Sequence, residues 1–175
     1  ANAQKQVALL VQPQVAFEKI YRVAFESWSN DVSAAAAIVL RMKNDVKEGL
    51  GVPLPTGTTT LYQADPQRRL LLGVGTIRDI AKGERVRLVA GVSEQIVARQ
   101  TIQGKQRQIT ATNSNPFSAP LEVAIGSAGE PDYRDASARL ERIDGVQTWR
   151  VMLPANGSAT FTYTVPDPCR RGQLC

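Results

Sequence analysis

Residues 42–63 read MKNDVKEGLGVPLPTGTTTLYQ and carry the strongest structural signals of the chain. Apolar and polar side chains alternate up to Asn44, which is the period of a half-buried strand, and an asparagine can bond its own turn backbone. Glycine and proline then occupy every second position from 49 to 57, which favours a bent, extended connection over a helix. The threonines and aromatic residue of Thr58–Tyr62 predict a return to a sheet.

Short apolar-alternating runs separated by turn residues make up the rest of the chain, and none has a sustained helical period. We therefore predict an all-β fold, an antiparallel β-sandwich with two immunoglobulin-like lobes. The remaining predicted strands are Gln6–Gln12, Val15–Glu26, Ser33–Lys43, Arg69–Ile77, Arg85–Ala90, Ser93–Gln103, Lys105–Thr112, Leu121–Ile125, Ala138–Ile143, Thr148–Leu153 and Ala159–Val165. The side chains expected to face the core are Phe17, Tyr21, Val23, Leu40, Met42, Val86, Leu88, Val123, Ile125 and Trp149.

A weak internal repeat guides the domain division. The pattern that ends at Asn44 recurs at Asn113, and each asparagine is followed about 40 residues later by a glycine turn, at Gly83 and Gly157. Whether the halves are homologous stays open, because the registers after the two glycines differ by one. We expect an N-terminal lobe over 1–103, a C-terminal lobe over 104–166 and a tail over 167–175.

The run GLGVPLPTGTTTLYQAD, followed by LLGVGTIRDIAKGERVRL, resembles the C-terminal region of bacterial envelope proteins related to mucoidy inhibitor A. FEKIYR upstream, and ITATN and NGSATFTYTV downstream, are similar to the same family, so the resemblance spans 7–165. Members are typically longer, with an N-terminal part and a coiled-coil insertion that are not present here. The resemblance implies a β-sandwich module outside the cytoplasm and supplies no catalytic residue.

Composition narrows the possible chemistry. The chain has no histidine, which removes the commonest general base and metal ligand. Its net charge of +5 admits an anionic partner, but the basic residues are dispersed and no nucleic-acid-binding motif is found, so nucleic acid is not expected. The longest apolar run is too short to span a bilayer as a helix. Because the chain starts with Ala1, we expect a processed or shortened protein.

Two groups of side chains could serve a site. Asp132 and Asp135, with Glu130 and Tyr133 beside them, could form a carboxylate pair for calcium or glycoside chemistry, although a solvated loop is the favoured interpretation. Aromatic side chains could stack on a sugar or peptide, but we favour packing in the fold for each of them: Trp28, Tyr62, Tyr133 and Trp149. No catalytic, cofactor-binding or metal-binding residue is assigned, and no cofactor is expected.

Cys169 and Cys175 are the only cysteines and follow two prolines that end the last strand. A zinc site needs more ligands, and a redox pair is usually closer together. We therefore predict a local disulfide formed in an oxidising compartment, which stabilises mainly the tail by at most about 2 kcal/mol; two free thiols are the alternative.

Two hypotheses for function follow. The first is a non-catalytic structural or interaction module of the bacterial envelope, periplasmic or otherwise exported. Its partner would be acidic, another envelope protein or an anionic polysaccharide, and the residues proposed to bind it are Arg78, Arg85, Arg87 and Arg99. The alternative is that these arginines only keep the strand faces solvated. The second is a surface-polysaccharide-binding protein or glycan-acting enzyme whose site consists of Asp132, Asp135 and the aromatic side chains named above. The sequence does not indicate the oligomeric state.

Overall fold

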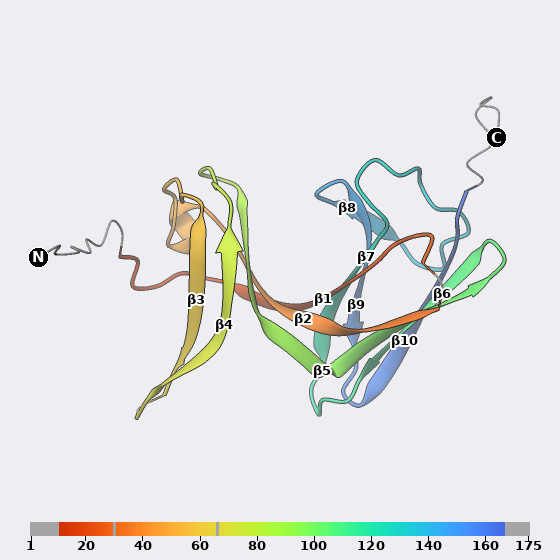
Figure 1. The fold of residues 1–175 in the computed structure, drawn as a ribbon, viewed down its shortest axis with the longest axis horizontal. Coiled ribbons are helices and arrows are strands. Elements are labelled where there is room, and N and C mark those ends of the chain that lie inside the picture. Colours follow the sequence, from red (N-terminus) through yellow and green to blue (C-terminus); the bar gives the residue numbers. More distant parts are fainter. Residues whose placement is uncertain (1–10, 30, 66, 167–175) are drawn as a thin grey trace, which may run out of the picture. The chain divides into compact units, whose positions relative to one another are not determined.

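The computed structural model describes residues 11–29, 31–65 and 67–166. Their secondary structure is almost entirely β, as the sequence predicts, with one short 3₁₀ turn (Figure 1). The elements in chain order are β1 (Glu18–Phe25), β2 (Val32–Lys43), η1 (Val46–Glu48), β3 (Gly57–Ala64), β4 (Arg69–Ile77), β5 (Arg85–Gln103), β6 (Gln106–Asn113), β7 (Ala119–Ile125), β8 (Leu140–Ile143), β9 (Val146–Leu153) and β10 (Gly157–Thr164).

Within the described residues the strands form two sheets. The larger has the order β10-β6-β5-β2-β1-β7-β9-β8, and the smaller contains β3 and β4 alone. Strands β1 and β7 pair in parallel, whereas the pairs β5–β6, β6–β10, β7–β9, β8–β9 and β3–β4 are antiparallel. The parallel pair joins segments about 100 residues apart in the sequence, so no local pattern predicts it.

Two compact units divide the chain. Unit 1 comprises Ala1–Glu18 and Leu40–Val89, and unit 2 comprises Lys19–Val39 and Ala90–Cys175. Gly104, where we expected one lobe to meet the next, lies in the β5–β6 turn inside unit 2. The observed units differ from the predicted lobes because β2 and β5 each run through both units. The boundaries therefore fall within strands and not at a turn. An immunoglobulin-like topology stays a prediction.

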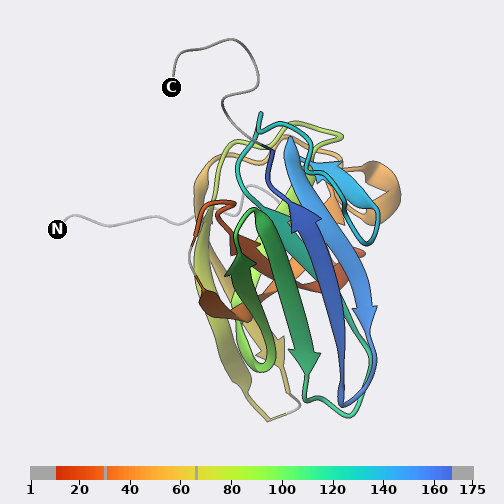
Figure 2. The same cartoon turned by 90° about the vertical axis from the view of Figure 1, so that its right-hand side faces the viewer.

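The hydrophobic core of unit 2 lies inside a curled sheet. Trp149 on β9 stacks on Phe161 of β10 with ring centroids 5.2 Å apart, and Phe161 in turn stacks on Tyr163 at 5.7 Å. Since β9 and β10 are not hydrogen-bonded neighbours, the sheet must fold over to bring their inner faces together. The result is a sandwich-like layer pair whose strands run alongside one another in the blue and green part of Figure 2.

Unit 1 is organised around a buried asparagine. Asn44 ends β2 with no exposed surface, and its Nδ2 donates to the carbonyl oxygens of Val52 (2.7 Å) and Ala81 (3.0 Å). Its Oδ1 accepts from the amide of Gly51 at 2.9 Å, and its own carbonyl accepts from the amide of Gly83 at 2.7 Å. One side chain therefore fastens the glycine- and proline-rich connection to the segment before β5.

Asn113 has the same structural role in unit 2 as Asn44 has in unit 1. It is fully buried at the end of β6, and its Nδ2 donates to the carbonyl oxygens of Phe117 (2.8 Å) and Pro154 (2.9 Å). It also lies opposite Gly157 at the start of β10. The repeated sequence pattern thus corresponds to a repeated local structure, in which an asparagine joins the loop that follows it to a distant turn.

Most of the predicted inward side chains are buried, but Phe17 is a clear error. Tyr21, Val23, Val86, Val123, Ile125 and Trp149 are buried, and Leu40, Met42 and Leu88 are partly buried. Phe17 is 59% exposed, because β1 begins only at Glu18 and the alternation does not extend back to it.

Three further differences concern the strands. The two strands predicted over 85–103 form one strand of 19 residues, since the ladder continues through Gly91. Asn156 takes a positive φ of 49° as expected for a turn, but β9 and β10 pair with other strands, so this turn crosses between layers and is not a hairpin. The predicted strand Gln6–Gln12 lies largely outside the described residues, and its residues 11 and 12 are not in a strand.

Candidate functional site

Unit 1 contains an open pocket with a volume of about 680 Å³. This volume falls within the range of small-molecule sites, roughly 300–1,000 Å³. Four short segments line it: the lead-in to β1, the end of β2, the η1 turn and the start of β5. The lining residues are Ala16, Phe17, Glu18, Arg41, Met42, Lys43, Glu48, Gly83 and Arg85.

The η1 turn forms one wall of the pocket, and local chemistry explains its shape. The Asp45 side chain accepts from the amide of Lys47 at 3.2 Å and so caps the turn at its start. Gly49 ends it with φ of 90°, and a Cβ there would lie 2.1 Å from the carbonyl oxygen of Gln14. Only glycine permits this crossing of the chain. The amide of Ala16 then donates to Glu48 at 2.9 Å and fixes the lead-in to β1 against the turn.

The pocket lining carries three cationic side chains, Arg41, Lys43 and Arg85, and two carboxylates. Arg41 pairs with Glu18 at 2.6 Å, and the backbone amide of Lys43 donates to Glu48 at 3.0 Å. Arg41 and Lys43 share one face of β2, because successive side chains of a strand alternate. The lining therefore has an excess of positive charge beside the exposed ring of Phe17.

The neighbouring acid Asp45 is held in its charged form. The hydrogen bond from the Lys47 amide keeps the pKa of Asp45 below its usual value, against a small opposing effect of burial and with a further contribution from Lys43. Its carboxylate lies 3.6 Å from the Lys43 ammonium. The pair is partly exposed, so it contributes little to stability, and the carboxylate partly offsets the charge of Lys43.

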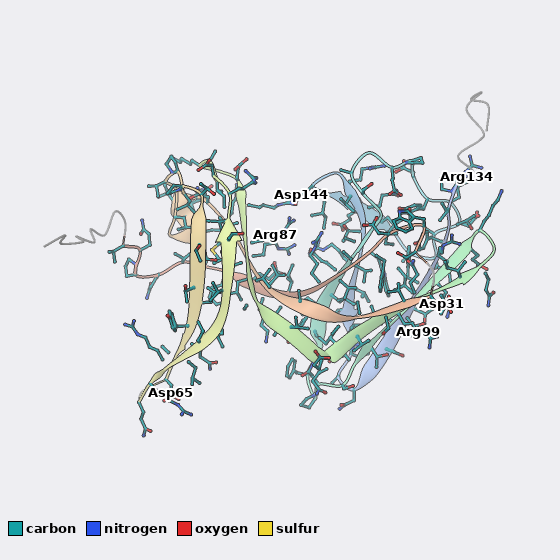
Figure 3. The ribbon with its side chains drawn as sticks, in the orientation of Figure 1. Asp31, Asp65, Arg87, Arg99, Arg134 and Asp144 are labelled. Carbon is teal, nitrogen blue, oxygen red and sulfur yellow. The ribbon has the colours of Figure 1, made fainter. Side chains whose placement is uncertain are left out.

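The four arginines proposed from the sequence do not form one site. Arg85 lines the pocket described above, whereas Arg78 lines a second one of about 570 Å³ next to Pro53, Pro55 and Glu84. Arg87 is partly buried on β5 of unit 1, and Arg99 is exposed on the part of β5 that belongs to unit 2 (Figure 3).

Arg78 also has a structural role. Its guanidinium donates to the Asp79 carbonyl at 2.8 Å and to the Glu84 carboxylate at 3.2 Å. The pKa of Glu84 is lowered, first by the hydrogen bond from the Ala81 amide and then by Arg78. This arginine orders the turn before β5 and remains largely exposed.

Sequence reasoning missed Arg41 and Lys43. Their spacing of two residues on a predicted strand places them on one face, and that signal could have identified them. What the sequence could not supply was the approach of Glu18 and Arg85 from other segments.

The loop between β7 and β8, called the acidic loop of unit 2, contains Asp132 and Asp135 and makes structural contacts within that unit. Asp132 accepts from Arg142 at 2.7 Å, and Asp135 occupies a turn position with φ of 50°. Tyr133, between them, is buried and lies 4.8 Å from Tyr163, ring to ring. The loop also pairs with β10, where the backbones of Arg134 and Thr164 exchange two hydrogen bonds, at 3.0 and 2.8 Å. It therefore covers the edge of the sheet.

Glu130 fixes the start of that loop. Its carboxylate accepts from the Tyr133 hydroxyl at 2.8 Å and from the Ser127 amide at 2.8 Å. Burial acts to raise the pKa of Glu130, but these hydrogen bonds outweigh burial and hold it below its usual value. Among the described residues, no three His, Cys, Asp or Glu side chains are placed to hold a metal ion.

The aromatic residues separate into two groups. Tyr133 and Trp149 are packed in the core, as favoured from the sequence. Trp28 and Tyr62 are 75% and 56% exposed, so the packing expected for them is wrong. Trp28 lies in the turn after β1, and Tyr62 lies on the more exposed face of β3.

Comparisons with known proteins add little. No family model matches the chain. No curated protein matches it either. Among solved structures, the folded domain of LppM from Mycobacterium tuberculosis is similar at a TM-score of 0.31 and 11% identity, over 93% of this chain and 98% of that one. A likeness at this level does not establish a shared fold, and no function is transferred from it.

Within the part of the chain that the structure describes, no helix has the length and apolar character needed to cross a membrane. Cys169 and Cys175 lie outside the described residues, so the disulfide stays a prediction.

Proposed function

We propose that the chain is a non-catalytic binding module of the bacterial envelope, and that the pocket of unit 1 binds an anionic group of its partner. The observation that carries this proposal is the convergence of Arg41, Lys43 and Arg85 on one open pocket. A carboxylate or sulfate on a polysaccharide, or an acidic side chain of another envelope protein, has the complementary charge.

The distribution of charge supports the same ligand class. Unit 1 holds 10 of the 21 Lys and Arg residues and 6 of the 16 Asp and Glu residues, so it carries a formal charge of +4 out of the total of +5. Of the two aspartates considered for catalysis, Asp132 is paired with Arg142 in the loop of unit 2. The placement outside the cytoplasm rests on the family resemblance and on the cysteine pair.

Titration with a polyuronate such as alginate tests the proposal. Arg85→Glu and Lys43→Glu should weaken binding by about tenfold or more, and affinity should fall as salt rises. Arg99→Glu is the matched control, since it makes the same charge change on the same strand but in unit 2. Equal losses for Arg85→Glu and Arg99→Glu would show that only net charge matters. Turnover of a glycan that is lost on changing Asp132 or Asp135 would replace the proposal with the enzymatic hypothesis.

A further inference from the structure

Strands β3 and β4 form a ribbon, defined here as Gly57–Ile77, which pairs with no other strand of the described residues. Such a two-stranded sheet is at best marginally stable in water unless one face packs on something. In Figure 1 the two strands run beside each other from β3 (gold) to β4 (yellow), and the turn at Asp65 marks the tip of the ribbon in Figure 3.

The two faces of the ribbon differ in exposure. One face carries Leu61 and Ile77, which are partly buried. On the other, Tyr62 lies directly opposite Leu71, and the adjacent pair is Thr60 with Val74. Tyr62, Leu71 and Val74 are 56%, 60% and 61% exposed. They form one continuous apolar strip, because paired residues of an antiparallel ladder point to the same side.

A bulge enlarges this strip towards the tip. The register shifts so that Leu61 faces Gly73 and Tyr62 faces Leu71, which leaves Leu72 as the extra residue. Leu72 is 44% exposed. Leu70, which is 38% exposed, pairs with Gln63 on the other face. Four large apolar side chains are thus presented to solvent on this strip, namely Tyr62, Leu71, Leu72 and Val74, and a patch of this kind indicates an interaction site.

Basic side chains border the apolar strip at its tip. Arg68 and Arg69 are both exposed, and Asp65 is the only acid in the ribbon. Asp65 is used in the turn itself, where its carboxylate accepts from the Gln67 amide at 3.0 Å. An apolar face that ends in two arginines suits a surface whose interior is apolar and whose boundary is negative.

A second copy of the chain fits this strip less well. Four exposed side chains offer on the order of a few hundred Å², whereas a stable dimer buries roughly 800 Å² per partner. A bilayer requires no matching shape. Tyrosine and arginine favour the interfacial zone, where the open edges of the ribbon can still bond water and headgroups.

We propose that the ribbon lays Tyr62, Leu71 and Val74 on an anionic bilayer surface, with Arg68 and Arg69 among the lipid headgroups. This binding goes beyond the proposed function, because it uses other residues and an apolar ligand. The chain would lie at the interface without spanning the membrane.

Co-sedimentation with vesicles tests the proposal. Vesicles of phosphatidylglycerol mixed with phosphatidylcholine should bind the chain more tightly than vesicles of phosphatidylcholine alone. Replacing Tyr62, Leu71 and Val74 together by serine should weaken that binding on the order of tenfold or more. Met152→Ser is the matched control, since Met152 is 62% exposed in unit 2. Equal loss with Met152→Ser, or no loss in the triple variant, would overturn the proposal.

Two further measurements keep the test decisive. The Arg68→Glu, Arg69→Glu variant changes two exposed positions at the tip of the ribbon, one in the turn and one at the start of β4, and it should abolish the preference for phosphatidylglycerol. Concentration-dependent dimers that the triple serine variant abolishes would assign the strip to a second copy instead. The unmodified chain and the same variants are also titrated with alginate. The variants should keep alginate binding, because they leave the pocket of unit 1 unchanged. If the unmodified chain binds alginate but no vesicles, this inference is overturned and the proposed function stands.

Discussion

Replacement of Asn44 by alanine is expected to destabilise unit 1 more than any other single truncation in that unit. The side chain is fully buried and makes two hydrogen bonds as donor, to Val52 and Ala81, and one as acceptor, from Gly51. Unit 1 has few other buried side chains, chiefly Ile80 and Val86, so no large apolar core can compensate.

The magnitude follows from the three hydrogen bonds. Each contributes about 1 kcal/mol net, and a buried group left without a partner adds about 1–3 kcal/mol. Asn44→Ala should therefore lower the free energy of unfolding of unit 1 by about 4–6 kcal/mol. Asn44→Asp keeps the acceptor but replaces the donor with a charge facing two carbonyl oxygens, so at neutral pH it should be at least as harmful.

Amide hydrogen exchange measures this locally, because the two units need not unfold together. Protection should fall in residues 40–64 and 69–89 of Asn44→Ala while unit 2 keeps its protection, and Asn113→Ala should show the reverse. If Asn44→Ala lost less than about 1 kcal/mol, the side chain would not hold unit 1 together as described.

The other predictions concern a glycine, two tyrosines and the cysteines. Gly49→Ala should lower the free energy of unfolding by about 3 kcal/mol or more, since it adds a backbone clash to the strain of positive φ. Gly83→Ala, at φ of 87° with open space around it, should lower it by only about 1–2 kcal/mol. Chemical denaturation of both variants tests this difference. Burial raises the pKa of Tyr133 and Tyr163 above their usual value, and Glu130 adds to the effect at Tyr133. The unfolded chain therefore ionises at lower pH than the folded protein. The contribution of these tyrosines to folding stability is complete below about pH 10 and falls above it. Denaturation at rising pH, followed by tyrosinate absorbance, should show this decline, and phenylalanine at both positions should flatten it. Intact mass after alkylation without reductant should show no alkylated thiol in the C-terminal tail of the exported protein; two would exclude the bridge.

Local signals in the sequence were sufficient for much of the fold. The predicted strand Arg69–Ile77 agrees with β4, and Ser33–Lys43 differs from β2 by one residue. Asn44 was identified as a strand end from its turn chemistry, and the glycine at 49 proved necessary for a close backbone crossing. These features depend on a few neighbouring residues, which is why they can be predicted.

What depends on distant segments could not be predicted. The parallel pairing of β1 with β7 has no local signature, and the exposure of Phe17 depends on where β1 begins. The pocket in unit 1 needs Glu18, Arg41 and Arg85 from three separate segments, so only Arg85 was proposed beforehand. Tyr62 belongs to a strand that the sequence predicts, but its 56% exposure depends on what packs against the β3–β4 ribbon, which no local pattern shows.

Mapping of alginate binding by amide chemical shifts in the isotope-labelled chain tests the proposed function most directly. The largest shifts should fall on residues 41–43, 48 and 83–85, the lining of the pocket in unit 1. They should diminish in Arg85→Glu and persist in Arg99→Glu. Shifts centred instead on the loop that contains Asp132 and Asp135 would contradict a binding module based on unit 1 and would place the ligand at the acidic loop of unit 2.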